Sequence, residues 1–205
     1  MKLKKALLII DVQNDFCPGG ALAVPEGDSI IPSINKYVSF FSKNKLPIFF
    51  TREWHPKNSK HFKKFGGIWP VHCVQNTKGA QFSPLLKLPK EAIIISRGMD
   101  RQKDSYSAFD GEDLNGMGLL NLLMIFGVKE LYIGGLATDY CVNSSAVDAL
   151  MKGFKVKILM DAVKGVNLRP QDSQEAIKDM QKLGAKKINL AVLQAKARKK
   201  NNKVT

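Results

Sequence analysis

Three histidines and a glutamate gather in one stretch of the sequence. His55, His61 and His72 are all the histidines of the 205-residue chain, and Glu53 lies two residues before the first of them. Neutral imidazoles and a carboxylate suit a divalent transition metal such as Zn²⁺, Fe²⁺ or Mn²⁺. The spacing is not that of a zinc finger, so three ordinary loop histidines are the alternative. Because all of them fall in one stretch, the pattern favours a metal site.

A cysteine forms the second candidate centre. Cys141 follows a glycine-rich turn, Gly134-Gly135-Leu136, and begins an amphipathic segment predicted to be helical. The N-terminus of a helix stabilises a thiolate, and N–H groups of such a turn are available to a developing oxyanion. A buried structural thiol is the alternative for any lone cysteine. Cys17 and Cys73 lack this setting and are interpreted as structural.

Two charged residues, Asp11 and Arg97, complete the set. Each directly follows a short apolar run, and Glu53 and Cys141 come after two further runs. In an open α/β sheet, ligands bind beyond the carboxyl ends of the strands. An acid, a cation, a thiol and a metal-type cluster therefore meet at one edge of the predicted sheet, and this convergence indicates an active site.

The elements that must position these residues alternate along the chain. Apolar runs suited to strands buried on both faces occupy residues 6–10, 47–51, 92–96, 130–134, 155–160 and 186–190. Amphipathic helical segments occupy residues 29–44, 114–126, 141–152 and 173–183, and the last three stop at a glycine. The alternation predicts an α/β fold with an open, mostly parallel six-stranded sheet and helices on both faces, a Rossmann-like three-layer arrangement.

One long segment interrupts this alternation. Residues 51–90 are rich in proline and glycine and hold both tryptophans and every histidine. A loop this long inside a compact domain is usually functional. We find no internal repeat and no linker, so we predict one domain over residues 1–193. The basic tail, residues 194–205, has no apolar period and is expected to be disordered.

The composition limits the classes of protein to consider. No apolar run approaches the ~20 residues of a membrane span, so we expect no membrane partner. The first apolar run stops at Asp11 and does not continue into the cleavage site of a signal peptide, so we expect a cytoplasmic protein. Three widely separated cysteines predict no disulfide framework. The formal charge of +14 lies partly in the tail and is otherwise scattered, which favours a solvated basic surface over nucleic-acid binding. A homo-oligomer is compatible with the sequence.

The motifs around these residues resemble those of the nicotinamidases in the isochorismatase-like hydrolase superfamily. The matching segments run through almost the whole chain and are residues 10–16, 18–20, 51–56, 69–73, 104–109, 135–142, 165–167 and 170–173. The first of them is common to the superfamily. The histidine loop together with Trp-Pro-Val-His-Cys at 69–73 is specific to nicotinamidases.

The resemblance implies a covalent mechanism on nicotinamide, and deamidation of pyrazinamide as well. Asp11 is the implied general base, which takes the Cys141 proton and later gives it to departing ammonia. Cys141 is the implied nucleophile, which forms an acyl-thioester. The N–H groups of Ala137 and Cys141 are the implied oxyanion hole, with a cis peptide between Leu136 and Ala137.

The resemblance also implies a cofactor and a substrate pocket. One divalent transition metal, with zinc expected ahead of iron or manganese, is implied on Glu53, His55, His61 and His72. It would hold waters and the pyridine nitrogen of the substrate. Phe16, Trp69 and Tyr106 are the implied walls of an aromatic pocket.

Two positions depart from the family pattern. Family members usually carry aspartate where this chain has Glu53, and their third catalytic residue is a lysine where this chain has Arg97. Arginine keeps the positive charge but does not readily release a proton, and Lys103 is a candidate substitute in the same loop.

Two alternatives to a nicotinamidase remain. One is an isochorismatase or a ureidoacid amidohydrolase, both of which lack the histidine loop. A non-catalytic or differently specific member of the superfamily is another.

Overall fold

The centre of the molecule is one six-stranded sheet. The structure is a computed structural model that describes residues 4–201, with side chains for residues 4–195. The strands are β1 (Lys4–Ile10), β2 (Ile48–Glu53), β3 (Ile93–Arg97), β4 (Val128–Leu136), β5 (Lys155–Lys164) and β6 (Lys186–Ile188). They lie in the order β3-β2-β1-β4-β5-β6, and every neighbouring pair is parallel. The predicted fold class is confirmed.

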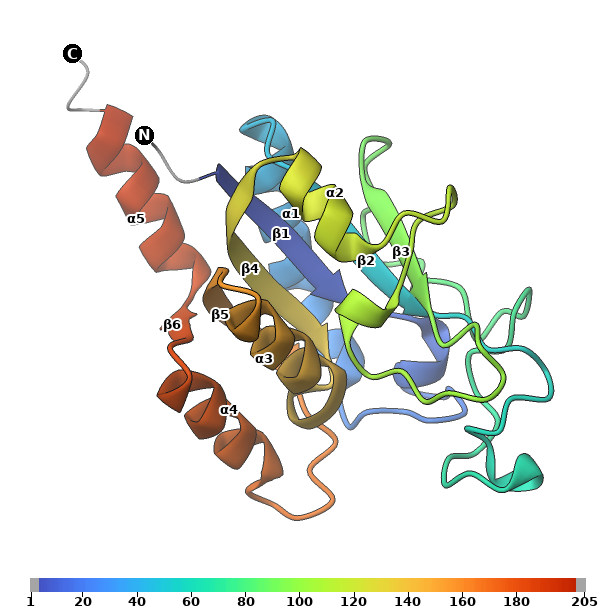
Figure 1. Ribbon diagram of the computed structural model, residues 1–205. Coiled ribbons are helices and arrows are strands. Elements are labelled where there is room, and N and C mark those ends of the chain that lie inside the picture. Colours follow the sequence, from blue (N-terminus) through green and yellow to red (C-terminus); the bar gives the residue numbers. More distant parts are fainter. Residues whose placement is uncertain (1–3, 202–205) are drawn as a thin grey trace.

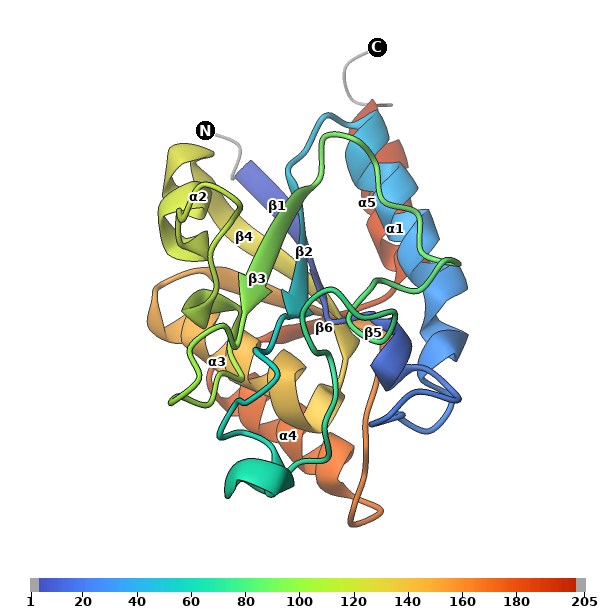
Figure 2. The same cartoon turned by 90° about the vertical axis from the view of Figure 1, so that its right-hand side faces the viewer.

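Helices cover both faces of this sheet, so the molecule has three layers (Figure 1, Figure 2). One face carries α1 (Ile31–Lys43) and α5 (Leu190–Asn201), and the other carries α2 (Leu119–Ile125), α3 (Asn143–Met151) and α4 (Asp172–Lys182). Within residues 4–201, no helix combines the length and apolarity that a membrane crossing requires.

The central strand β1 is buried on both faces, which accounts for the unbroken apolar run in its sequence. Leu7 and Ile9 pack into the core beneath α1, whereas Ala6, Leu8 and Ile10 pack into the core beneath α2 and α3. All five side chains are fully buried. A strand covered by helices on both faces has no solvent side, so polar residues do not alternate with apolar ones.

The segment before α2 is less regular than the sequence suggests. A helix was predicted over residues 114–126, but α2 begins at Leu119. Leu114 is 86% exposed and therefore contributes nothing to a helix face packed on the sheet. The chain here instead runs beside the edge strand β3, where Ser96 and Glu112 exchange two backbone hydrogen bonds of 2.8 and 3.1 Å.

The C-terminal helix α5 differs from the prediction. The expected disorder of residues 194–205 is wrong for residues 194–201, which complete α5, and residues 202–205 lie outside the described part. The segment Leu-Ala-Val-Leu-Gln-Ala-Lys-Ala-Arg-Lys-Lys is rich in strong helix formers, and buried Leu193 anchors its first turn in the core. Helix propensity therefore sustains this segment where apolar periodicity is lacking.

The strand order also fixes where a ligand site belongs. β1 lies between β2 and β4, and the chain winds outward from it in both directions. Such a point, where the direction of winding reverses, opens a crevice at the carboxyl ends of the strands. Asp11 leaves β1 at this point, and the Cys141 segment leaves β4 beside it.

Candidate active site and metal centre

Asp11 is held rigidly at the end of β1. Its backbone has a φ of 48°, in the left-handed region that few non-glycine residues adopt. Thr51 on the neighbouring strand donates its hydroxyl to Oδ1 of Asp11 at 2.6 Å. The carboxylate is buried, so its position depends on these neighbours rather than on water.

Arg97 brings a cation to this carboxylate from the edge of the sheet. It ends β3, and β2 lies between β3 and β1, so the long side chain must cross a whole strand. Its Nη2 donates to the Asp11 carboxylate, lies 2.8 Å from Oε1 of Glu53, and lies 2.8 Å from Sγ of Cys141. Its Nη1 donates to the carbonyl of Ser105. The guanidinium is fully buried, and it contacts the Asp11 carboxylate, the Cys141 thiol and the Glu53 carboxylate of the histidine cluster.

Lys103 does not take part in this centre. Its ammonium pairs loosely with Asp100 at 3.9 Å, and its side chain is 80% exposed. A lysine that points into solvent cannot replace Arg97 beside Asp11. The sequence-based candidate substitute is therefore wrong.

Cys141 reaches the centre from β4. The strand ends at Leu136, the Leu136–Ala137 peptide is cis as the resemblance implies, and a π-helical turn (Thr138–Val142) leads into α3. Ala137 and Cys141 both line the same cavity. Their N–H groups as an oxyanion hole remain a prediction.

Burial dominates the electrostatics of these groups. Burial raises the pKa of Asp11 even though Arg97 opposes the shift, and burial raises the pKa of the Cys141 thiol well above its usual range. Burial acts on Glu53 in the same sense, but Arg97 and the hydrogen bonds of His55 and His72 hold the pKa of this carboxyl well below its ordinary value. Glu53 is thus a carboxylate, as a metal ligand must be.

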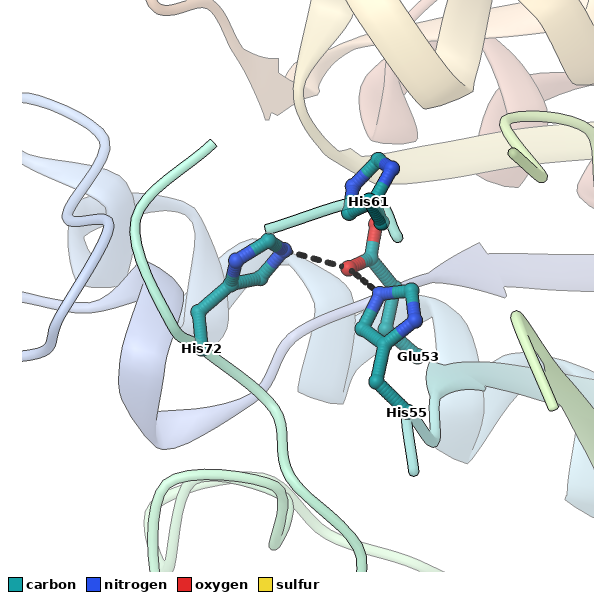
Figure 3. A group of neighbouring side chains, drawn as sticks. All are labelled: Glu53, His55, His61 and His72. Atoms are coloured by element: carbon teal, nitrogen blue, oxygen red, sulfur yellow. Dashed lines mark hydrogen bonds and ion pairs between the residues drawn. The ribbon is translucent and has the colours of Figure 1, made fainter. Parts of the chain in front are cut away.

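The four predicted metal ligands come together in one buried cluster (Figure 3). One potential ligand atom of each residue lies within 4.8 Å of those of the others. Figure 3 shows Glu53 between His55 and His72, and its Oε2 is 2.8 Å from Nε2 of each ring. The rings of His55 and His61 stack with centroids 4.8 Å apart.

The outer nitrogens of the three rings test whether this donor set fits a cation. Nδ1 of His55 donates to the carbonyl of Gly98, and Nδ1 of His72 donates to that of Pro70, because a carbonyl only accepts. Nδ1 of His61 lies 2.6 Å from Oδ1 of Asp104. In the neutral rings, every Nε2 then carries a lone pair. With Nδ1 already donating, the rings of His55 and His72 bond Oε2 of Glu53 at 2.8 Å only when Nε2 carries an additional proton. A divalent cation among the Nε2 lone pairs can take the place of such protons, so the donor set fits a metal ion.

A mainly apolar cavity adjoins both centres. Its walls include the three predicted pocket residues Phe16, Trp69 and Tyr106, together with Asp11, Glu53, His61, His72 and Cys141. Sequence reasoning missed several further wall residues, among them Leu22, Ala23, Val24, Tyr140 and Val166. Tyr140 had a signal, since it directly precedes Cys141. The others lie in irregular segments whose positions no periodicity predicts.

The aromatic part of this wall is tied together across three segments of the chain. Nε1 of Trp69 donates to the hydroxyl of Tyr106 at 2.9 Å, and the Trp69 and Tyr140 rings meet edge to face with centroids 5.4 Å apart. The cavity therefore has a preformed slot suited to a small planar ring.

Comparison with known proteins supplies the family. A model of the isochorismatase domain matches residues 5–192, nearly the whole length of the described chain. The chain belongs to the isochorismatase family.

Several members of the isochorismatase family are close relatives. A nicotinamidase of Escherichia coli is 40% identical over 203 residues, which cover 91% of this chain and 95% of the relative. The pyrazinamidase of Pyrococcus horikoshii in complex with zinc is 46% identical with a TM-score of 0.85, covering 91% of this chain and 99% of that one. A protein from L. infantum in complex with nicotinate is 34% identical with a TM-score of 0.81, covering 92% and 93%.

Proposed function

We propose that this chain is a nicotinamidase that hydrolyses nicotinamide to nicotinate and ammonia and also deamidates pyrazinamide. The observation that carries the proposal is the contact of the Arg97 guanidinium with three groups of the cavity wall. These groups are the Cys141 thiol, the Asp11 carboxylate and the carboxylate of the predicted metal ligand Glu53. The relatives support it, since they include a nicotinamidase, a pyrazinamidase and a nicotinate complex.

The chemistry begins at Cys141. Its Sγ attacks the carboxamide carbon, and Asp11 accepts the thiol proton. The C–N bond then breaks, Asp11 returns the proton to the leaving nitrogen, and ammonia departs from a thioester. Water, deprotonated by Asp11, hydrolyses the thioester to nicotinate and restores the thiol. A buried carboxyl whose pKa is raised by its surroundings suits a group that gains and loses a proton in each half-reaction.

Arg97 acts in this scheme as a fixed positive charge. Its guanidinium does not release a proton. Burial alone would lower its pKa, but the negative charges of Asp11, Cys141 and Glu53 outweigh burial and hold the pKa well above the ordinary arginine value. The charge lies against both the base and the nucleophile. It therefore stabilises the Asp11 carboxylate before the proton moves and the Cys141 thiolate afterwards.

Glu53, His55, His61 and His72 would hold one divalent metal, with zinc first and iron or manganese as alternatives. The zinc complex of the pyrazinamidase relative supports this choice. A metal bound there supplies a Lewis-acid site for the pyridine nitrogen of the substrate. Phe16, Trp69 and Tyr106 flank the ring and orient the carboxamide toward Sγ.

The decisive experiment measures ammonia release from nicotinamide by protein of known metal content. We expect turnover by the wild type and a loss of at least about 10³-fold in kcat for Cys141→Ala, as for other removed nucleophiles. Cys17→Ala is the matched control, since Cys17 is also a buried free thiol but does not line the cavity, and it should keep wild-type activity.

Two results would overturn the assignment. Wild-type protein that contains metal but releases no ammonia would favour the non-catalytic or differently specific alternative. Unimpaired turnover by Cys141→Ala would remove Cys141 as the nucleophile.

The same proposal includes a cytoplasmic location. The three cysteines are all free and buried, which suits a reducing compartment.

A further inference from the structure

The loop after β3 contributes no metal ligand, yet it touches two of the three metal-site histidines. The carbonyl of Gly98 accepts from Nδ1 of His55 at 3.0 Å, and Oδ1 of Asp104 accepts from Nδ1 of His61 at 2.6 Å. The backbone carbonyl is available whatever residue stands at its position. The contact to His61 depends instead on a single side chain.

The two loops that meet here are joined along their length. The N–H of Lys60 donates to the carbonyl of Arg101 at 2.9 Å, and Nε of Arg101 donates to the carbonyl of Asn58 at 3.1 Å. The loop that carries His61 is therefore already held beside residues 98–106 by contacts that do not involve Asp104. Removing the Asp104 carboxylate should leave this docking in place and release only the ring of His61.

The His61–Asp104 contact differs from an ordinary surface ion pair. The Asp104 side chain is 57% exposed, whereas that of His61 is 3% exposed. An exposed carboxylate near a surface charge contributes little to stability. Here its partner is a buried ring that stacks on His55. A carboxylate bonded to the outer nitrogen of a metal-binding histidine typically fixes the tautomer and the rotation of the ring.

We propose, on the basis of the metal centre in the proposed function, that Asp104 is a positioning residue for the metal. Its carboxylate holds the proton of His61 on Nδ1, so that the Nε2 lone pair faces the cluster formed with Glu53 and His72. It thereby sets the affinity for the ion without touching it. Asp104 belongs to the same loop as Tyr106, so this contact also ties the metal centre to the substrate wall.

The experiment measures zinc affinity by competition with a chromophoric chelator in the full-length protein. We expect Asp104→Ala to bind zinc roughly 10- to 100-fold more weakly, which is typical for loss of a carboxylate behind a metal-bound histidine. Asp104→Asn should lie between, because its amide oxygen still accepts a hydrogen bond but carries no charge. Asp100→Ala is the matched control. Asp100 is 52% exposed in the same loop, and among the described residues its carboxylate contacts Gln102 and Lys103 and none of the histidines, so its loss should leave zinc affinity unchanged.

A second readout separates positioning from general loosening of the loop. ¹⁵N NMR of the imidazole side chains in metal-free protein should show the Nδ1–H tautomer of His61 in wild type and Asp100→Ala, and a tautomer mixture in Asp104→Ala. Zinc affinity of Asp104→Ala within twofold of wild type, or an equal loss in Asp100→Ala, overturns the inference alone. Wild-type protein that binds no zinc, iron or manganese overturns the proposed metal centre together with it.

Discussion

At the scale of single residues, the two departures from the nicotinamidase pattern touch each other. Nη2 of Arg97 and Oε1 of Glu53 are 2.8 Å apart, while Oε2 of Glu53 faces His55 and His72. The longer acid thus spans the distance between the histidine cluster and the guanidinium. A single carboxylate connects the metal-type centre to the nucleophile.

The charge of Arg97 should matter more than its shape. We expect Arg97→Lys to keep kcat/KM within about tenfold of wild type, because an ammonium still faces Asp11 and Cys141, although it loses the Ser105 contact. Arg97→Ala should lower kcat/KM by on the order of 10²-fold or more, as loss of a fixed catalytic charge typically does. Both variants are to be measured with nicotinamide at equal metal content. An inactive Arg97→Lys beside an active wild type would mean that the site requires a guanidinium.

The sequence predicted most of this centre because the chemistry-bearing residues follow strands. Asp11, Glu53, Arg97 and Cys141 each come at or after a strand end, and a parallel sheet brings such ends to one edge. Strand order was not predictable from the pattern. That is why the edge position of Arg97, and its reach across β2, emerge only from the structure.

At the scale of elements, the apolar runs located all six strands to within a few residues. The signal is clearest in β1, where burial on both faces leaves an unbroken apolar run, whereas Lys186 and Lys187 of β6 are exposed. The helix starts were less well predicted. The apolar side chains of Leu114 and Met117 are exposed, so the helix begins only at Leu119. Helix α5 has helix-forming residues without apolar periodicity. Side chains that line the cavity from loops, such as Leu22 and Val166, follow no repeating pattern at all.

The turn at the end of β3 depends on Gly98. Its φ is +71°, and a Cβ there would lie 2.5 Å from Cε1 of His55. We expect Gly98→Ala to weaken zinc binding at least about tenfold by displacing this ring, in addition to roughly 1–2 kcal/mol of left-handed backbone strain. Gly116→Ala is the control, because its φ is +76° with nothing within 4 Å of the added Cβ.

Chelator competition and thermal melts of the two glycine variants separate these effects. Equal losses of stability with unchanged zinc affinity would mean that the His55 ring yields to the added methyl group.

At the scale of the whole molecule, the proposed metal links segments that the sheet alone does not join. Its ligands come from the end of β2 and from the long loop that follows, which has little regular structure. An ion that binds the folded chain stabilises it by mass action, by about 2.7 kcal/mol at 100 times its Kd.

Removal of the metal should therefore lower the melting temperature of the whole protein. We expect a chelator-treated sample to melt several degrees lower, since about 1 kcal/mol corresponds to a shift of roughly 2–4 °C in a chain of this size. Added zinc should restore the melting temperature in wild type but not in a His55→Ala/His72→Ala variant, measured by scanning calorimetry. Equal zinc responses in the two proteins would place the stabilising ion elsewhere.

The pair of backbone bonds between Ser96 and Glu112 bears on how the protein behaves in a crowded solution. β3 is an edge strand of the sheet, and unpaired N–H and C=O groups on an edge strand can form hydrogen bonds with a strand of another molecule. Glu112 occupies that edge through both of its backbone groups and brings a carboxylate with it. At the opposite edge, β6 has only three residues, too few to template a long pairing. Neither end of the sheet is therefore suited to growth by strand addition, and the molecule should resist fibrillar aggregation even when concentrated.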